Sequence, residues 1–255
     1  IAPDGKLVLT LDANGRGQLW DALGQPIAAL DYGEPIIAGQ FAANGQALYT
    51  IADDDSAQRW SAGGELLGAS EPIGAPLEEL EVSADGRRAL LFTHEGAAWL
   101  WDSGAAQALH LNAEGNGVGD YNANYATTGA FSPDGQLAAI GWTDGRLEIW
   151  DLGGLADGAA PPAPRLLRGH ARWINSVAFS PDGQLLLTAS ADASARLWQL
   201  DGTPASVFLS GDEPMIQAAF SPDGQQVLTA SLDGTARLWD LSGFQQLAFR
   251  HTTPV

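Results

Sequence analysis

The residue types best suited to chemistry lie close together in the second half of the chain. His170, Ser190 and Asp192 supply an imidazole, a hydroxyl and a carboxylate. Enzymes that cleave esters and amides use the same three groups as base, nucleophile and orienting acid. By residue type alone, segment 170–192 could therefore support hydrolytic chemistry.

Metal and thiol chemistry has less support in the sequence. The other histidines, His94, His110 and His251, stand singly, and no two histidines have the spacing of metal ligands. The chain has 0 cysteines, which excludes disulfides, thiolate metal sites and a cysteine nucleophile. We therefore predict no metal site and no cofactor.

A recurring tryptophan shows which elements must hold His170, Ser190 and Asp192. Each tryptophan follows the Asp or Asn of an Asp-Gly or Asn-Gly turn by sixteen residues, and the interval recurs six times along the chain. A fixed internal period of this kind indicates a repeat architecture. The six units close at Trp20, Trp60, Trp101, Trp150, Trp198 and Trp239.

One unit of the repeat predicts four short strands and no helix. In unit five, β-rich runs at 173–179, 184–190, 195–199 and 206–209 are separated by tight-turn residues, among them Asp182-Gly183. Such an antiparallel meander cannot bury both of its faces alone. Radial stacking of similar units gives a β-propeller. A linear solenoid is the competing geometry, but its repeats usually carry a helix or fewer strands.

The motifs of units four to six resemble those of the WD (WD40) repeat family. Unit five carries Gly169-His170, a Ser-Pro-Asp-Gly turn at 180–183 and Trp198, and units four and six carry the same turn with a closing Trp-Asp. Units one to three are degenerate. The resemblance implies an all-β propeller of four-stranded antiparallel blades over residues 1–255, as one domain that is a fragment of a longer chain. The six units either close into a ring or form part of an array of seven or more blades.

The resemblance also changes the interpretation of the hydrolase-like residues. WD repeats have a structural hydrogen-bonded tetrad of His, Ser or Thr, Asp and Trp, and the matching residues are His170, Ser190, Asp192 and Trp198. We therefore predict that these residues hold the fold together and that the chain has no catalytic residue. Unit six has Gly211 where the histidine would stand.

Charge limits the class of partner. The chain has 12 Lys and Arg against 31 Asp and Glu, a formal net charge of −19. Nucleic-acid phosphates and anionic membrane surfaces are held mainly by basic residues, so neither is a predicted partner. No apolar run approaches the roughly 20 residues that cross a bilayer. We expect a cytoplasmic protein that binds a protein or peptide, which could be a domain of the same parent chain.

A proline or an aromatic residue stands near the start of most first strands, and these positions indicate where the binding surface lies. By analogy with the family, partners bind where loops enter strand one and join strands two and three, and aromatic residues with Arg are favoured anchors of interfaces. A Gly/Ala/Pro-rich insertion at 153–164 is a predicted passive spacer. An Asn/Tyr-rich insertion at 112–124 is a predicted contact loop. The candidate residues are Trp173, Arg172, Tyr125, Tyr121, Met215, Asn122 and Asn124.

The function predicted from these features is a non-enzymatic protein-interaction scaffold. A second possibility is a C-terminal sensor or autoinhibitory module of a signalling ATPase, kinase or protease-like effector. A third is a propeller that binds a small ligand or performs catalysis in its central channel. A convergent polar cluster in the channel would favour this third possibility.

Overall fold

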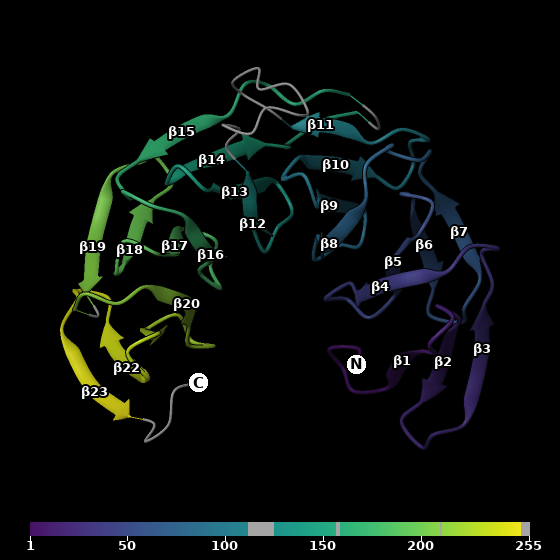
Figure 1. The fold of residues 1–255 in the computed structure, drawn as a ribbon, viewed down its shortest axis with the longest axis horizontal. Coiled ribbons are helices and arrows are strands. Elements are labelled where there is room, and N and C mark those ends of the chain that lie inside the picture. The colour runs from purple at the N-terminus through teal and green to yellow at the C-terminus, as the bar shows by residue number, and fades with distance from the viewer. Residues whose placement is uncertain (112–124, 157–158, 210, 251–255) are drawn as a thin grey trace. The chain divides into compact units, whose positions relative to one another are not determined.

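The computed structural model of the protein describes residues 1–111, 125–156, 159–209 and 211–250, which form strands and turns and no helix (Figure 1). These residues build six antiparallel sheets in chain order. The all-β fold of the β-propeller type is thus confirmed. By internal contacts the chain divides into two compact units, Ile1–Tyr121 with Gly154–Pro161, and Asn122–Gly153 with Pro162–Val255.

The first unit holds three sheets. The first sheet has three strands, and the second and third have four each. Within each sheet, a hairpin joins every strand to the next one in sequence. The strands are β1 (Leu7–Leu11), β2 (Gly17–Asp21) and β3 (Pro26–Leu30), then β4 (Ile36–Phe41), β5 (Ala47–Ala52), β6 (Ala57–Ser61) and β7 (Leu66–Ala69), then β8 (Leu77–Val82), β9 (Arg88–Thr93), β10 (Ala98–Asp102) and β11 (Leu109–Leu111).

The second unit holds three four-stranded sheets with the same connections. The strands are β12 (Ala126–Phe131), β13 (Leu137–Trp142), β14 (Arg146–Asp151) and β15 (Arg165–Arg168), then β16 (Ile174–Phe179), β17 (Leu185–Ser190), β18 (Ser194–Gln199) and β19 (Pro204–Leu209), then β20 (Met215–Phe220), β21 (Gln226–Ser231), β22 (Thr235–Asp240) and β23 (Gln245–Arg250). Unit five of the repeat therefore has the four strands that its sequence predicts. In five sheets the first strand ends four residues before the glycine of the turn that follows it, at Phe41, Val82, Phe131, Phe179 and Phe220.

The turn between first and second strands is closed by its own side chains. In the fifth sheet Ser180 Oγ donates to Asp182 Oδ1 at 2.6 Å and accepts from the Leu185 N–H at 2.9 Å. Asp182 Oδ1 also accepts from the Gln184 N–H. Gly183 takes a φ of 71°, a left-handed conformation in which a side chain would be strained. The Ser-Pro-Asp-Gly sequence thus specifies the turn through local hydrogen bonds.

Apolar side chains fill the space between neighbouring sheets within each unit. In the second unit, one core joins the fourth and fifth sheets and includes Leu147, Leu167, Ile174 and Trp198. A second core joins the fifth and sixth sheets through three strands of each. The first unit has two equivalent cores. The middle sheet of each unit, the second and the fifth, therefore contributes one apolar face to each of two neighbours, as stacked repeats require.

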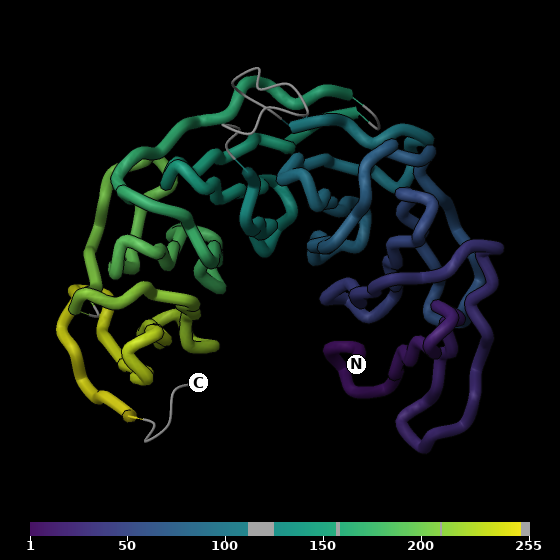
Figure 2. Tube along the Cα trace, in the orientation of Figure 1, coloured from purple at the N-terminus to yellow at the C-terminus, as the bar shows by residue number. Residues whose placement is uncertain are grey.

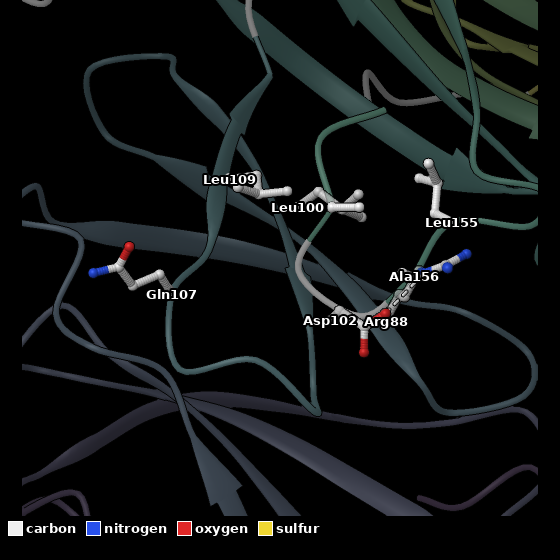
Figure 3. A pocket seen from close by; sticks show the side chains of 8 residues that line it. Arg88, Leu100, Asp102, Gln107, Leu109, Leu155 and Ala156 are labelled. Atoms are coloured by element: carbon white, nitrogen blue, oxygen red, sulfur yellow. Dashed lines mark hydrogen bonds and ion pairs between the residues drawn. The ribbon is translucent and has the colours of Figure 1, made fainter. Parts of the chain in front are cut away.

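The two sequence insertions have different outcomes. The predicted Asn/Tyr-rich contact loop at 112–124 lies outside the described residues. Within the predicted spacer, Leu155 and Ala156 lie beside the third sheet and line a small cavity with Arg88 and Asp102 (Figure 3). These two residues of the segment therefore pack against a sheet of the first unit. In the part of the chain that the structure describes, no helix is long and apolar enough to span a membrane.

Candidate functional site

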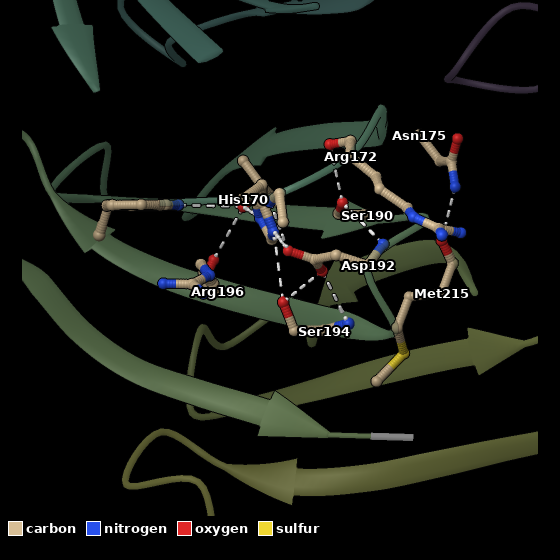
Figure 4. Close-up of polar contacts among 11 residues, drawn as sticks. His170, Arg172, Asn175, Ser190, Asp192, Ser194, Arg196 and Met215 are labelled. Atoms are coloured by element: carbon tan, nitrogen blue, oxygen red, sulfur yellow. Dashed lines mark hydrogen bonds and ion pairs between the residues drawn. The ribbon is translucent and has the colours of Figure 1, made fainter. Parts of the chain in front are cut away.

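A buried polar network surrounds His170, at the point where the chain turns into the fifth sheet (Figure 4). His170 Nδ1 lies 3.0 Å from Asp192 Oδ2, and His170 Nε2 lies 2.7 Å from Thr188 Oγ1. The indole N–H of Trp198 donates to the same Thr188 hydroxyl at 3.0 Å. The imidazole and the indole thus share one oxygen.

The hydroxyl that joins His170 to Trp198 therefore belongs to Thr188, which the sequence reasoning did not assign. Ser190, the predicted member of the tetrad, lies one step further along the same network. Its Oγ accepts from the Asp192 N–H at 3.1 Å and donates to the Arg172 carbonyl at 3.1 Å. Ser190 consequently ties the loop before β16 to the turn between β17 and β18.

Spacing in the sequence could have identified Thr188. A threonine precedes the closing tryptophan by ten residues in four of the six units, and in each the indole N–H donates to its hydroxyl. The register explains the interval, because Thr188 pairs with Arg196, two residues before Trp198 on the neighbouring strand. Side chains two residues apart on a strand share a face. The four threonines are Thr10, Thr50, Thr188 and Thr229.

Electrostatics favour an ionised Asp192. Burial alone would raise its pKa, but hydrogen bonds from His170, Ser194 and the Ala171 N–H outweigh burial, so the pKa lies well below its ordinary value. Ser194 Oγ donates to Asp192 Oδ1 at 2.6 Å, and the Ala171 N–H donates to Oδ2 at 3.0 Å. The carboxylate is thus the acceptor that organises the loop before β16.

The network has the connectivity of a hydroxyl–imidazole–carboxylate triad but is closed to a substrate. The Thr188 side chain is fully buried, and so is the His170 side chain. The indole of Trp198 contacts the imidazole edge-on, at 6.1 Å between ring centroids. A catalytic nucleophile has to reach a substrate atom, and these groups reach only one another. The geometry supports a structural role.

What the network does position is an exposed surface at the same end of the second unit. Trp173 directly precedes β16, and its carbonyl accepts from the Ala191 N–H at 2.9 Å. The fourth sheet repeats this contact between Tyr125 and Thr143, and the sixth repeats it between Pro214 and Leu232. Because the three contacts occupy equivalent positions on neighbouring sheets, the loops that carry them share one end of the unit.

Large side chains gather on these loops. Trp173 is 59% exposed, Tyr125 and Leu232 are also exposed, and Arg172 beside Trp173 is exposed as well. We call these four residues the rim surface. Leu232 was missed by the sequence reasoning, although an apolar residue within the tight turn that precedes Trp239 is a usable signal. Trp and Arg are among the side chains that most often dominate binding energy at interfaces.

One predicted rim residue is elsewhere. Met215 is fully buried and packs in the core between the fifth and sixth sheets, with Leu197, Phe208 and Trp239 around it. The prediction that Met215 is exposed to a partner is therefore wrong. As the first residue of β20 it faces the neighbouring sheet, and its backbone carbonyl accepts from Asn175 Nδ2. Tyr121, Asn122 and Asn124 lie outside the described residues.

Other possible sites in the described residues are small or open. The cavity beside Arg88 and Asp102 has a volume of about 10 Å³, the room of one water molecule (Figure 3). A larger open hollow of about 470 Å³ lies along β1 and β4, and Gln40 is its one polar side chain. No group of three His, Asp or Glu among the described residues could hold a metal ion.

Comparison with known proteins identifies two of the units. Residues 163–199 and 204–240 match the family model of the WD domain, G-beta repeat. The first segment spans the last strand of the fourth sheet and the first three strands of the fifth, and the second spans the last strand of the fifth sheet and the first three of the sixth. The sequence motifs are most regular in these segments. No curated protein matches the chain significantly. The resemblance inferred from the motifs is thus confirmed for these segments.

Proposed function

We propose that this chain, whose segments 163–199 and 204–240 are WD repeats, is a scaffold that binds a protein or peptide on the rim surface. WD repeats in general support protein interaction, and they are generally non-enzymatic. The observation that carries the proposal is Trp173, whose indole is mostly exposed although it directly precedes a strand anchored by the buried His170 network.

An anchored, exposed indole suits binding for a physical reason. The backbone at Trp173 is held, because the Ala171 N–H donates to Asp192, the Arg172 carbonyl accepts from Ser190, and the carbonyl of Trp173 itself accepts from the Ala191 N–H. A side chain presented by fixed backbone loses less conformational freedom when a partner covers it. Arg172, Tyr125 and Leu232 add a charge and further apolar area around it.

Composition supports a protein or peptide as the partner. The formal net charge of −19 is unfavourable for phosphate backbones and anionic lipid. The rim surface combines aromatic, aliphatic and guanidinium groups, which is the mixture found at the centre of protein interfaces. The hydroxyls of Thr188, Ser190 and Ser194 and the carboxylate of Asp192 hydrogen-bond within the His170 network. They therefore hold the loops in place, and the rim surface is the part that a partner can contact.

The test is affinity capture from lysate on the immobilised chain, with bound proteins identified by mass spectrometry. Trp173→Ala/Tyr125→Ala should lose a protein that the unaltered chain retains. The matched control is Phe244→Ala/Leu23→Ala, which removes two apolar side chains that are more exposed than Trp173 and Tyr125. Both lie in turns that follow the third strand of a repeat, at the end of the repeat opposite to the rim surface. Circular dichroism confirms that each variant is folded. Equal capture by the rim variant and the unaltered chain would refute the rim surface as the binding site.

A further inference from the structure

The loops that lead into β16 and β20 have the same backbone contacts. In the fifth sheet Ser190 Oγ donates to the Arg172 carbonyl at 3.1 Å, and in the sixth Ser231 Oγ donates to the Glu213 carbonyl at 3.4 Å. Figure 2 shows these two sheets side by side within the second unit, in green and yellow. Arg172 and Glu213 therefore occupy equivalent positions on neighbouring loops, and their side chains can be compared directly.

The two loops differ in charge. The fifth sheet has Ala171-Arg172 where the sixth has Asp212-Glu213, and Arg172, Asp212 and Glu213 are all exposed. One loop thus presents a guanidinium beside the exposed indole of Trp173, and the next loop presents two carboxylates. Packed sheets lie about 10 Å apart, so the charge changes sign over roughly that distance.

The guanidinium of Arg172 takes no part in holding its own loop. The backbone carbonyl of Arg172 accepts from Ser190, but the side chain makes no hydrogen bond and no ion pair with any residue that the structure describes. In Figure 4 the guanidinium extends away from His170 and Asp192, which contact each other. The charge of Arg172 is therefore available to a partner.

A partner that covers Trp173 has to satisfy the charge of Arg172. A protein interface of ordinary size covers about 800 Å² of each partner, far more than one indole, so it also removes water from the side chain next to Trp173. Removing water from an unpaired charge is costly. A carboxylate offsets that cost, because it accepts two parallel hydrogen bonds from a guanidinium. By the same reasoning, a cation of the partner suits the loop with Asp212 and Glu213.

We propose, on the basis of the scaffold function above, that the rim surface binds an extended peptide segment with an acidic and a basic residue about three positions apart and an apolar residue between them. The acidic side chain pairs with Arg172, the apolar side chain covers Trp173, and the basic side chain lies beside Asp212. An extended chain rises about 3.3 Å per residue, so three residues span the roughly 10 Å between the loops. The formal net charge of −19 favours neutral or basic residues around this motif.

Selection from a phage-displayed library of random peptides on the immobilised chain tests the proposal. The selected peptides should share an acidic and a basic residue on either side of an apolar residue. A synthetic peptide with this consensus sequence is then titrated against the unaltered chain and its variants by fluorescence polarisation. Trp173→Ala and Arg172→Gln should each weaken binding at least tenfold. Circular dichroism confirms that each variant is folded.

The matched control is Gln184→Glu, which changes the net charge by the same amount as Arg172→Gln. Gln184 is exposed in the turn between β16 and β17, at the opposite end of the same sheet, so its replacement should leave the affinity unchanged. A second peptide has an amide in place of the acidic residue. It should bind the unaltered chain at least tenfold more weakly than the consensus peptide, and the two peptides should bind Arg172→Gln equally, because paired groups give non-additive losses.

The outcome for Trp173 separates a failure of the charge pairing from a failure of the scaffold function. Selected peptides that need Trp173 but lack the acidic or the basic residue overturn the charge pairing alone. Equal affinity of the consensus peptide for Arg172→Gln and the unaltered chain does the same. A selection that yields no peptide dependent on Trp173 overturns both the charge pairing and the rim surface as the binding site.

Discussion

Replacing Thr188 with valine should destabilise the protein more than the same change at Thr229, the equivalent threonine of the sixth sheet. Thr188 and Thr229 occupy equivalent positions, both are buried, and each accepts the indole N–H of its closing tryptophan, at 3.0 Å and 2.9 Å. Only Thr188 also contacts an imidazole nitrogen, at 2.7 Å. Valine keeps the shape and strand preference of threonine and removes the oxygen.

The magnitude follows from the number of buried groups left without a partner. Each costs about 1–3 kcal/mol. Thr229→Val strands the indole N–H of Trp239, so we expect a loss of about 1–2 kcal/mol in the free energy of unfolding. Thr188→Val strands the indole of Trp198 and also His170 Nε2, so we expect about 2–4 kcal/mol. The difference, roughly 1–2 kcal/mol, measures the contact with the histidine.

Urea unfolding followed by tryptophan fluorescence and far-UV circular dichroism measures both losses. The combined variant Thr188→Val/His170→Ala supplies the control, because two residues that share one hydrogen bond give a non-additive loss. The combined loss should therefore be smaller than the sum of the single losses. A Thr188→Val variant no less stable than Thr229→Val, with additive losses in the combined variant, would refute the reasoning.

Three further predictions concern protonation and backbone geometry. Burial raises the pKa of Glu148 from 4.5 to about 7, so the stability that the protonated carboxyl contributes is complete below pH 4.5 and is lost as the pH rises towards 7. In urea unfolding, Glu148→Gln should therefore remove a loss of up to about 3 kcal/mol in the free energy of unfolding between pH 5 and 8. Folding lowers the pKa of Asp192, so the stability that its carboxylate contributes is present above pH 3.8, the ordinary pKa of the group, and is lost on further acidification. Asp192→Asn should therefore flatten the acid side of the curve of unfolding free energy against pH, measured by urea unfolding. A Cβ at Gly145 would lie 2.5 Å from the His170 carbonyl oxygen, whereas one at Gly154 would meet nothing within 4 Å, and both have positive φ; Gly145→Ala should therefore lower the melting temperature much more than Gly154→Ala.

The sequence predicts the strands well because their signals are local. Turn residues mark each hairpin, and the interval from turn to tryptophan carries the register, so the ends of the first strands could be placed to the residue. The identity of the shared hydroxyl is harder to predict. Ser190 and Thr188 lie on the same strand two residues apart, and the register with β18 decides which of them meets Trp198. The signal of that register in the sequence is the ten-residue interval from threonine to tryptophan, which four of the six units share.

Exposure at the rim is equally hard to predict from spacing. Trp173 and Met215 both lie where a first strand begins, yet Met215 is the first residue of β20 and Trp173 precedes the first residue of β16. A shift of one residue along a strand turns a side chain to the opposite face. Met215 consequently fills a core, and Trp173 stays exposed. The position equivalent to Trp173 in the sixth sheet is Pro214, and the exposed apolar residue there is Leu232, on the neighbouring turn.

The serine–aspartate turns also bear on how the chain folds. The same closure, with a serine hydroxyl donating to the aspartate two residues later, occurs at Ser83, Ser132, Ser180 and Ser221. Its hydrogen bonds span at most five residues, so they form without waiting for any sheet to pack. Hairpins close within about 1–10 μs, whereas contacts between sheets require loops of about forty residues to close. We therefore expect folding to begin at several turns in parallel and to proceed by docking neighbouring hairpins, with no single nucleus.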